Sequence, residues 1–371
     1  EGAAMPTAAA ADPIKLQTVV HGVALAIMLG WILHIGASVL VPMVLALMLS
    51  YVVVGLSRLI NAVPGVGAWL PSWLSVLLST VLIGYGIVQL VILFAANVAA
   101  FGAQSADFQA NALAMIQSGA AYVGFAGDVS WETLRRDVLG PVNLQALIRS
   151  GLSSSAALLG GLLFVLLNLI FMLLERRSLD AKLGAMSSDP TRVARLRVVV
   201  TDINTRIGRY LAVKTMINVV LGLICFGIML AFGLEFAVLW AIVIALLNYI
   251  PYLGSWLGVG FPVLFAIVQF GDFETVLMLV LALSAAQFLV GNVFEPFVMG
   301  NSLDLSPYVI LIGLTVWSSL WGVAGAIVSV PITAVIVIVL SEFKGARAIA
   351  VLLSRNGDLA ARTIAAPRGQ E

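Results

Sequence analysis

The sequence predicts an all-α polytopic membrane protein: a helix bundle of about eight spans that includes two broken or re-entrant helical hairpins and a small extracytoplasmic helical insert. Composition is the first reason. Hydrophobic residues fill 61% of the 371 positions and charged residues only 10%, and the mean hydropathy is +1.10. Soluble domains carry about 25% charged residues. This chain has too few polar side chains to cover a globule, so we expect hydrocarbon around most of it.

Long apolar runs are the second reason, because a helix needs about 20 apolar residues to cross a hydrocarbon core of about 30 Å. Such runs lie at about 17–34, 37–57, 73–96, 155–174, 213–233 and 275–294. The first begins after Lys15 and continues into the second without a clear cleavage site. We therefore expect a retained first span rather than a removable signal.

Two further apolar regions, 236–270 and 308–340, are each interrupted near the middle, which predicts the hairpins. The interrupting residues are Asn248, Pro251, Gly254 and Ser255 in the first region, and Gly322, Gly325 and Pro331 in the second. Where a helix breaks inside a membrane, its freed N–H and C=O groups must be satisfied by protein, water or solute. Paired interruptions of this kind are typical of the binding sites of secondary transporters.

Lysine and arginine placement predicts the orientation, because cytoplasmic loops are enriched in both. The segment 175–214 holds nine of the 19 Lys and Arg residues, and the tail 342–371 holds five more. Both are expected in the cytoplasm, together with the N-terminus. The segment 97–152 has few basic residues and is expected outside. We interpret it as a packing and assembly element, with a soluble-ligand module as the alternative.

A candidate site centres on Glu295, which closes the apolar run before Pro296. Ser284, Gln287, Gly291 and Glu295 share one face at helical spacing, and a polar stripe on an apolar helix should face a bundle interior or a water-filled path. A carboxylate at mid-membrane depth costs about 2.5–3.5 kcal/mol, so it needs a cation, a proton or a partner such as Asn292. The alternative places Glu295 at the cytoplasmic interface with no special role.

Several enzyme classes lack their signatures in this sequence. A rhomboid-type protease needs a histidine after its Gly-x-Ser nucleophile, but His21 and His34 both precede the match at 300–302. No zinc-protease, intramembrane aspartyl-protease or Walker sequence occurs. We therefore expect no enzyme activity, no catalytic or metal-binding residues, no cofactor and no nucleic-acid partner. A carrier is favoured over a passive channel, which a broken helix can also line, and over a scaffold.

Motifs in the C-terminal half resemble the autoinducer-2 exporter family of bacterial membrane proteins. They are Asn248-Tyr-Ile-Pro-Tyr-Leu-Gly-Ser255, Gly291-Asn-Val-Phe-Glu-Pro296, Met299-Gly300, Leu305-Ser-Pro307, and Trp321-Gly-Val-Ala-Gly325 leading to Val330-Pro331. The N-terminal half is similar in layout only. The resemblance implies an elevator-like transporter without an ATP-binding domain, in a bacterial cell (inner) membrane. It also implies a homo-oligomer, with a pentamer as the expected form.

The resemblance implies one of two cargoes, a small polar solute such as autoinducer-2 or a monovalent cation in sodium–proton exchange. An uncharged, polyhydroxylated solute needs hydrogen-bonding partners, whereas cation exchange needs a titratable carboxylate, for which Glu295 is the best placed. The expected substrate-binding residues are Asn248, Pro251, Tyr252, Gly254, Ser255, Gln287, Asn292 and Glu295.

The predicted organisation has six parts along the chain. These are N-terminal spans that form a frame (1–96), the insert (97–152), a fourth span (153–174), a cytoplasmic basic amphipathic region (175–212), a transport core that contains both hairpins (213–341) and a cytoplasmic tail (342–371). Within the basic region, Asp189 followed by Pro190 predicts the start of a helix.

Overall fold

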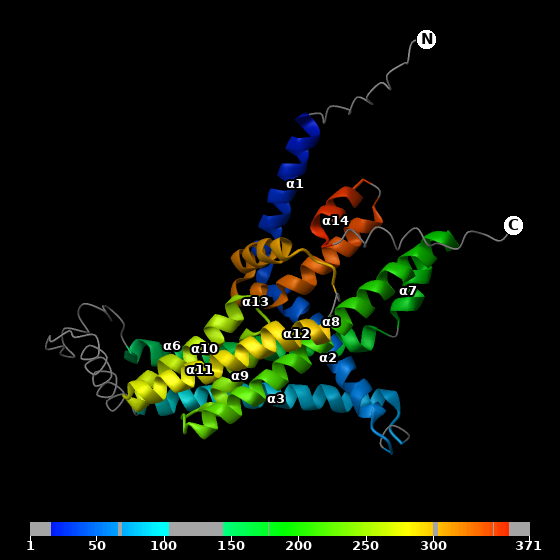
Figure 1. The fold of residues 1–371 in the computed structure, drawn as a ribbon. Coiled ribbons are helices and arrows are strands. Elements are labelled where there is room, and N and C mark those ends of the chain that lie inside the picture. The colour runs from blue at the N-terminus through cyan, green and yellow to red at the C-terminus, as the bar shows by residue number, and fades with distance from the viewer. Residues whose placement is uncertain are drawn as a thin grey trace, which may run out of the picture.

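A computed structural model describes residues 16–65, 69–103, 144–176, 178–299, 303–343 and 345–355. These residues are helical almost throughout (Figure 1), and their one β contact is an isolated antiparallel bridge between Leu305 and Ser354. By length and composition, six helices of this part of the chain can cross a membrane, and shorter apolar helices accompany them. The predicted all-α polytopic bundle is confirmed.

The N-terminal half comprises α1 (Leu16–Ile35), α2 (Ala37–Ala62), α3 (Ser72–Ala103) and α6 (Leu144–Glu175). Helices α2, α3 and α6 pack on one another around a small core of Ala46, Val53, Val165 and Leu169. Helix α1 stands away from them (Figure 1) and contacts α2 and α13. Most of the predicted 97–152 insert, including everything from 104 to 143, lies outside the described residues.

The structure does not separate the predicted basic region, 175–212, from the span that follows it. After the short α7 (Leu179–Ala185), a single helix α8 runs for 42 residues from Pro190 to Ala231. Its start is as predicted, because the Asp189 side chain accepts a hydrogen bond from the Thr191 N–H. The predicted division at 212/213 falls inside this helix. No proline interrupts the sequence there, so the change from basic to apolar residues occurs within one continuous helix.

The first predicted hairpin is confirmed as α9 (Ala237–Leu247) and α10 (Leu253–Phe270), joined by a break at 248–252. Tyr252 has φ +62° in this break. Gly254 permits the tight return, because a Cβ at this position would lie 2.0 Å from the carbonyl oxygen of Leu247. Only glycine fits that approach.

The second hairpin lies within α13 (Pro307–Glu342), which changes direction at Gly322 with φ 60° and ψ −139°. Its arms pack together: Trp317 Nε1 donates to Thr333 Oγ1 at 3.3 Å, and a Cβ on Gly325 would lie 1.9 Å from the carbonyl oxygen of Trp317. The prediction that Pro331 helps to break this region is wrong. Pro331 is fully buried inside the second arm, where the helix continues.

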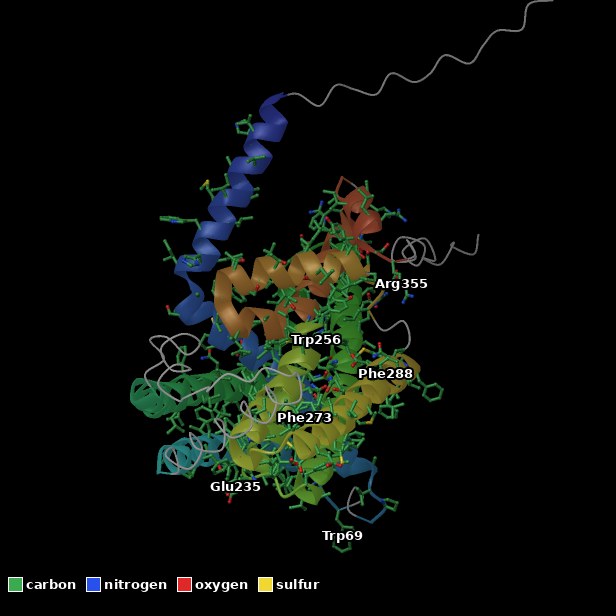
Figure 2. All side chains as sticks on the ribbon, turned by 60° about the vertical axis from the view of Figure 1, so that its left-hand side comes forward. Trp69, Glu235, Trp256, Phe273, Phe288 and Arg355 are labelled. Atoms are coloured by element: carbon green, nitrogen blue, oxygen red, sulfur yellow. The ribbon has the colours of Figure 1, made fainter. Side chains whose placement is uncertain are left out.

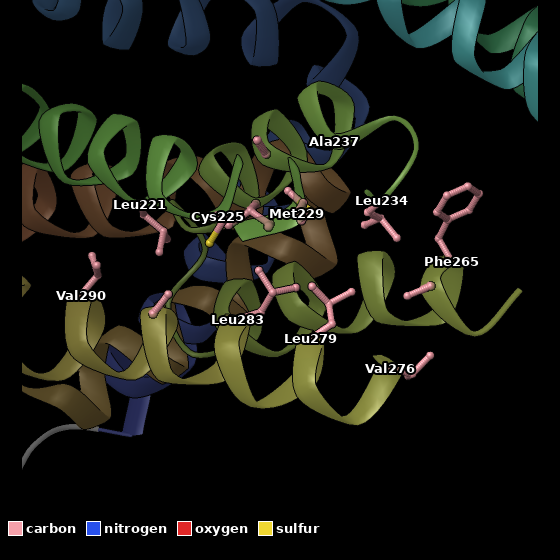
Figure 3. Packing of buried hydrophobic residues seen from close by; sticks show 14 of the residues in the cluster. Leu221, Cys225, Met229, Leu234, Ala237, Phe265, Val276, Leu279, Leu283 and Val290 are labelled. Carbon is pink, nitrogen blue, oxygen red and sulfur yellow. The ribbon is translucent and has the colours of Figure 1, made fainter. Parts of the chain in front are cut away.

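The helix expected to end at Glu295 continues past it. Helix α11 (Phe273–Leu289) leads into a π-helical turn, η1 (Val290–Phe294), and then into α12 (Glu295–Met299). The largest hydrophobic cluster joins α8, α9, α10 and α11 (Figure 3), with Leu221, Leu279 and Leu283 fully buried and Cys225 among them. The final described helix, α14 (Arg347–Leu353), packs on α13.

Candidate functional site

A cavity of about 380 Å³ lies where α8, the break between α9 and α10, the π-helical turn and the 303–305 segment meet. It is lined by residues from all four and from α10, α12, α13 and the C-terminal segment. They include Tyr210, Lys214, Asn248, Tyr249, Pro251, Tyr252, Ser255, Asn292, Glu295, Asp304 and Arg355. Because the break exposes backbone and short polar side chains at a helix interruption, the cavity is polar in an otherwise apolar bundle.

A buried ion pair forms one wall of the cavity. Lys214 Nζ lies 2.6 Å from Glu295 Oε1, with 8% of the lysine side chain and 23% of the glutamate side chain exposed. Removing two charges from water is costly unless they pair closely. The pair gives Glu295 a cationic partner and leaves its carboxylate only partly exposed. The described residues contain no group of three His, Cys, Asp or Glu side chains arranged to hold a metal ion.

A chain of amides connects three elements behind the cavity. Asn248 Nδ2 donates to Asn218 Oδ1 at 2.8 Å, and Gln287 Nε2 donates to Asn248 Oδ1 at 3.1 Å and to Ser255 Oγ at 2.9 Å. Gln287 Oε1 is buried without a hydrogen-bond partner among the described residues. The network therefore fixes the broken end of α9 against α8 and α11. It leaves one acceptor, Gln287 Oε1, and one donor, Asn218 Nδ2, unsatisfied among the described residues.

Hydroxyl groups supply the rest of the polar lining. The Tyr249 hydroxyl lies 2.7 Å from Thr215 Oγ1, which also donates to the Leu211 carbonyl. Tyr210 is buried one helical turn before Lys214, whereas Tyr252 is half exposed at the mouth. Hydroxyls donate and accept, so the cavity offers both hydrogen-bond roles to a bound molecule.

The π-helical turn places Gly291, Asn292 and Glu295 together on the cavity. An extra residue in the turn shifts the helical register, and Ser284, predicted on the same stripe, is exposed outside the cavity. The predicted support of Glu295 by Asn292 is not present in this structure. The Asn292 amide donates instead to the carbonyl of Phe288 at 3.2 Å.

The C-terminal segment closes one side of the cavity. The Ser306 N–H donates to the Leu353 carbonyl at 3.2 Å, and the Arg355 N–H donates to the Asp304 carbonyl at 3.0 Å. Arg355, labelled in Figure 2, therefore lines the cavity, although its position in the sequence is distant from the first hairpin. The two cationic residues of the lining, Lys214 and Arg355, equal its two acidic residues in number, so the lining carries no formal net charge.

The structure brings most of the predicted binding residues together. Six of them line the cavity: Asn248, Pro251, Tyr252, Ser255, Asn292 and Glu295. Gln287 lies behind them in the amide network, and Gly254 shapes the break. Gly322 and Gly325 belong to the second hairpin and do not line this cavity. That these side chains bind a solute stays a prediction.

Sequence reasoning missed Tyr210, Lys214, Tyr249, Asp304 and Arg355. Lys214 was assigned to the basic cytoplasmic segment because of its charge, yet it is 6% exposed within α8. One signal was present. Tyr210, Lys214 and Asn218 are spaced four residues apart, which places them on one helix face that leads into an apolar stretch.

Residues 22–345 match the family described as AI-2E family transporter. The chain belongs to this family. Three curated relatives are similar to it: the AI-2 transport protein TqsA of Escherichia coli K12, the "Putative transport protein YhhT" of the same organism, and a "Putative transport protein" of Borreliella burgdorferi. The family and these names support a role in transport for this membrane protein.

TqsA is 31% identical over 228 residues, which cover 61% of this chain and 64% of TqsA. YhhT is 30% identical over 59% of this chain and 61% of YhhT. The Borreliella protein is 32% identical over 52% of this chain and 53% of its own length. The matched part thus spans between about half and two thirds of the curated relatives.

Proposed function

We propose that this AI-2E family protein is a secondary transporter that exports a small, uncharged, polar signalling molecule of the autoinducer-2 kind. The cavity at the break of the first hairpin is the observation that carries the proposal. Its amide and hydroxyl groups donate and accept hydrogen bonds, while its charged groups balance one another. A neutral solute rich in hydroxyls suits such a lining, and TqsA carries AI-2 transport in its name.

The proposed mechanism is elevator-like movement of one unit against another. The first hairpin packs with α8 and α11 in one hydrophobic cluster, and the second hairpin packs with α8, α14 and α2 in another. Residues of both hairpins line the cavity. Helices α3 and α6 pack with α2 in a third cluster, which we assign to the frame. We further propose a bacterial inner-membrane location with both termini cytoplasmic, because the basic residues concentrate in 175–214 and in the tail. A homo-oligomer, with a pentamer as the expected form, would anchor the frame.

Sodium–proton exchange is the second candidate, and the Lys214–Glu295 pair favours it. The Lys214 ammonium pairs with the Glu295 carboxylate. A sodium ion or proton that binds this carboxylate would therefore compete with the ammonium. A passive channel is the third candidate, because the same broken hairpin can line a pore.

Flux into proteoliposomes of the purified protein tests these candidates. Labelled autoinducer-2 is offered with and without imposed sodium and proton gradients. Accumulation against the solute gradient, lost when the ion gradient is collapsed, is the expected result. Sodium–proton exchange without movement of autoinducer-2 would assign the antiporter function instead. Flux that only equilibrates would indicate a channel or uncoupled carrier, and no flux would contradict the proposal.

A further inference from the structure

A second cavity, of about 570 Å³, lies between α2, α3 and α6 and has no role in the proposed solute path. Its walls are mostly apolar, with contributions from Val54, Val76, Leu77, Ile170 and Leu173. We call it the α2–α3–α6 groove. It opens on the outer side of the three helices, since Leu77 and Ile170 are about half exposed.

One end of this groove is marked by charge and by aromatic side chains. Arg176 follows the last residue of α6 and lines the groove together with Ser72 and Trp73 at the start of α3. The guanidinium of Arg176 makes no ion pair with a residue that the structure describes. Trp69, in the preceding loop, is exposed at the same end of α3 (Figure 2). Tryptophans at helix ends are typical of the membrane–water interface.

We infer that the α2–α3–α6 groove binds an anionic glycerophospholipid. The apolar walls match an acyl chain, and Arg176 at the interfacial end matches the lipid phosphate in charge and in hydrogen-bonding geometry. The basic segment begins at Arg176, and we expect it at the membrane surface, where anionic headgroups gather around cationic side chains. This site is independent of the cargo and of the proposed transport function.

A second copy of the chain is the other occupant that such an apolar face could take. The unpaired cation at the groove's end favours a phosphate, because a cation buried in a protein interface without a carboxylate would be unfavourable. The described groove residues include no acidic side chain. The phosphate of a lipid would pair with Arg176, and its acyl chains would contact the leucine side chains of the groove.

Native mass spectrometry of the purified full chain tests the inference. The protein is titrated with phosphatidylglycerol and with phosphatidylcholine of identical acyl chains. We expect phosphatidylglycerol to bind about fivefold more tightly than phosphatidylcholine. This ratio corresponds to the attraction between one cationic side chain and an anionic headgroup. Arg176→Gln should abolish this preference. Arg58→Gln is the matched control, because Arg58 is exposed on α2 outside the groove and the charge change is the same.

A groove-filling variant separates chain binding from surface charge. Leu77→Trp adds bulk at a half-exposed position and should displace both lipids while the charge stays unchanged. Four results would overturn the inference: equal binding of the two lipids to the wild type, equal losses in Arg176→Gln and Arg58→Gln, unaltered adducts in Leu77→Trp, or displacement of the lipid by free glycerol phosphate. A change of oligomer mass in Leu77→Trp with lipid adducts unchanged would assign the groove to a second copy instead.

Discussion

Lys214 and Glu295 neutralise each other inside a bundle that offers few other partners to a charge. The ammonium is nearly enclosed, and its contact with the carboxylate joins α8 to the residue that begins α12. Removal of one partner leaves the other charge buried and uncompensated, which typically costs more than the pair itself contributes. The two residues should therefore behave as a unit, in stability and in any ion coupling.

The charge pair gives the first prediction. Lys214→Met and Glu295→Gln should each lower the free energy of unfolding by about 3 kcal/mol, whereas the double variant should recover most of that loss. Thermal melting of the detergent-purified variants measures the effect. Glu295→Gln should also abolish proton- or sodium-coupled flux in proteoliposomes. Unchanged coupling in this variant would reduce the pair to a structural contact. Additive losses in the double variant would show that the two side chains do not stabilise each other.

The cap of α8 gives a prediction on pH. The Thr191 side-chain hydroxyl and its backbone N–H donate to the Asp189 carboxylate and hold its pKa below its usual range. A lowered pKa in the folded state means that the cap stabilises the helix above the unfolded value, about 3.9, and is lost as the pH falls through the lower folded value. Hydrogen exchange of the first turns of α8 measures this loss.

Asp189→Asn and Asp189→Ala provide the controls for that measurement. Asparagine still caps a helix but does not titrate, so its protection should remain constant across the acidic range. Alanine should leave the first turns of α8 exchanging faster at every pH. Protection in the wild type that is indifferent to acid would contradict this account of the cap.

The residues of the site were only partly predictable from the sequence. Asn248, Ser255 and Glu295 interrupt or end apolar runs, so the local sequence pattern identifies them as candidates. Arg355 could not be found this way, because backbone hydrogen bonds to the 304–306 segment bring it to the cavity from far along the chain. The charge of Lys214 predicts a solvent-exposed side chain. Its burial depends on Glu295, which lies 81 residues away in the sequence, so no local pattern reveals it.

At the scale of elements, both hairpins depend on glycines that touch the backbone of the opposite arm. The missing Cβ of Gly254 leaves room for the Leu247 carbonyl, and that of Gly325 leaves room for the Trp317 carbonyl. A backbone oxygen cannot rotate away as a side chain can. The sequence predicted both breaks well, since glycine and asparagine interrupt an apolar run visibly. It did not predict the π-helical turn, because no residue type specifies an extra residue in a helix.

Gly254→Ala and Gly325→Ala should each destabilise the fold by about 3 kcal/mol, at the upper end of the range for overpacking. The added methyl would meet backbone at 2.0 and 1.9 Å, so the arms must separate. Gly227→Ala is the control, because a Cβ there meets nothing within 4 Å and alanine is the better helix former. Melting temperatures of the three variants test this: those of Gly254→Ala and Gly325→Ala should fall, and that of Gly227→Ala should not. Equal melting temperatures would show that the arms separate without cost.

On the scale of the whole molecule, the proposed movement requires α8 to slide against α2. Hydrogen bonds join the proposed moving unit to both α2 and α1. The Tyr51 hydroxyl donates to Asn204 Oδ1 at 2.7 Å, and Trp321 Nε1 of the second hairpin donates to the carbonyl of Leu33 on α1 at 2.9 Å. These hydrogen bonds must break when the hairpins move, whereas the amide network within the moving unit should persist.

A disulfide between α2 and α8 tests that movement directly. A Cβ on Gly55 would lie 3.7 Å from the Ala212 Cβ, close to the mean separation of about 3.8 Å in disulfides. Gly55→Cys with Ala212→Cys, in a Cys225→Ala background, should crosslink on oxidation and stop flux until a reductant is added. A Cβ on Gly222 would lie 3.2 Å from the Ala245 Cβ within the moving unit, slightly below the usual disulfide range of about 3.5–4.5 Å. After a small shift of α9, a Gly222→Cys, Ala245→Cys pair should crosslink without loss of flux. If flux continued with α2 and α8 joined, α8 would belong to the frame, and movement of the unit that we propose, which includes α8, would be contradicted.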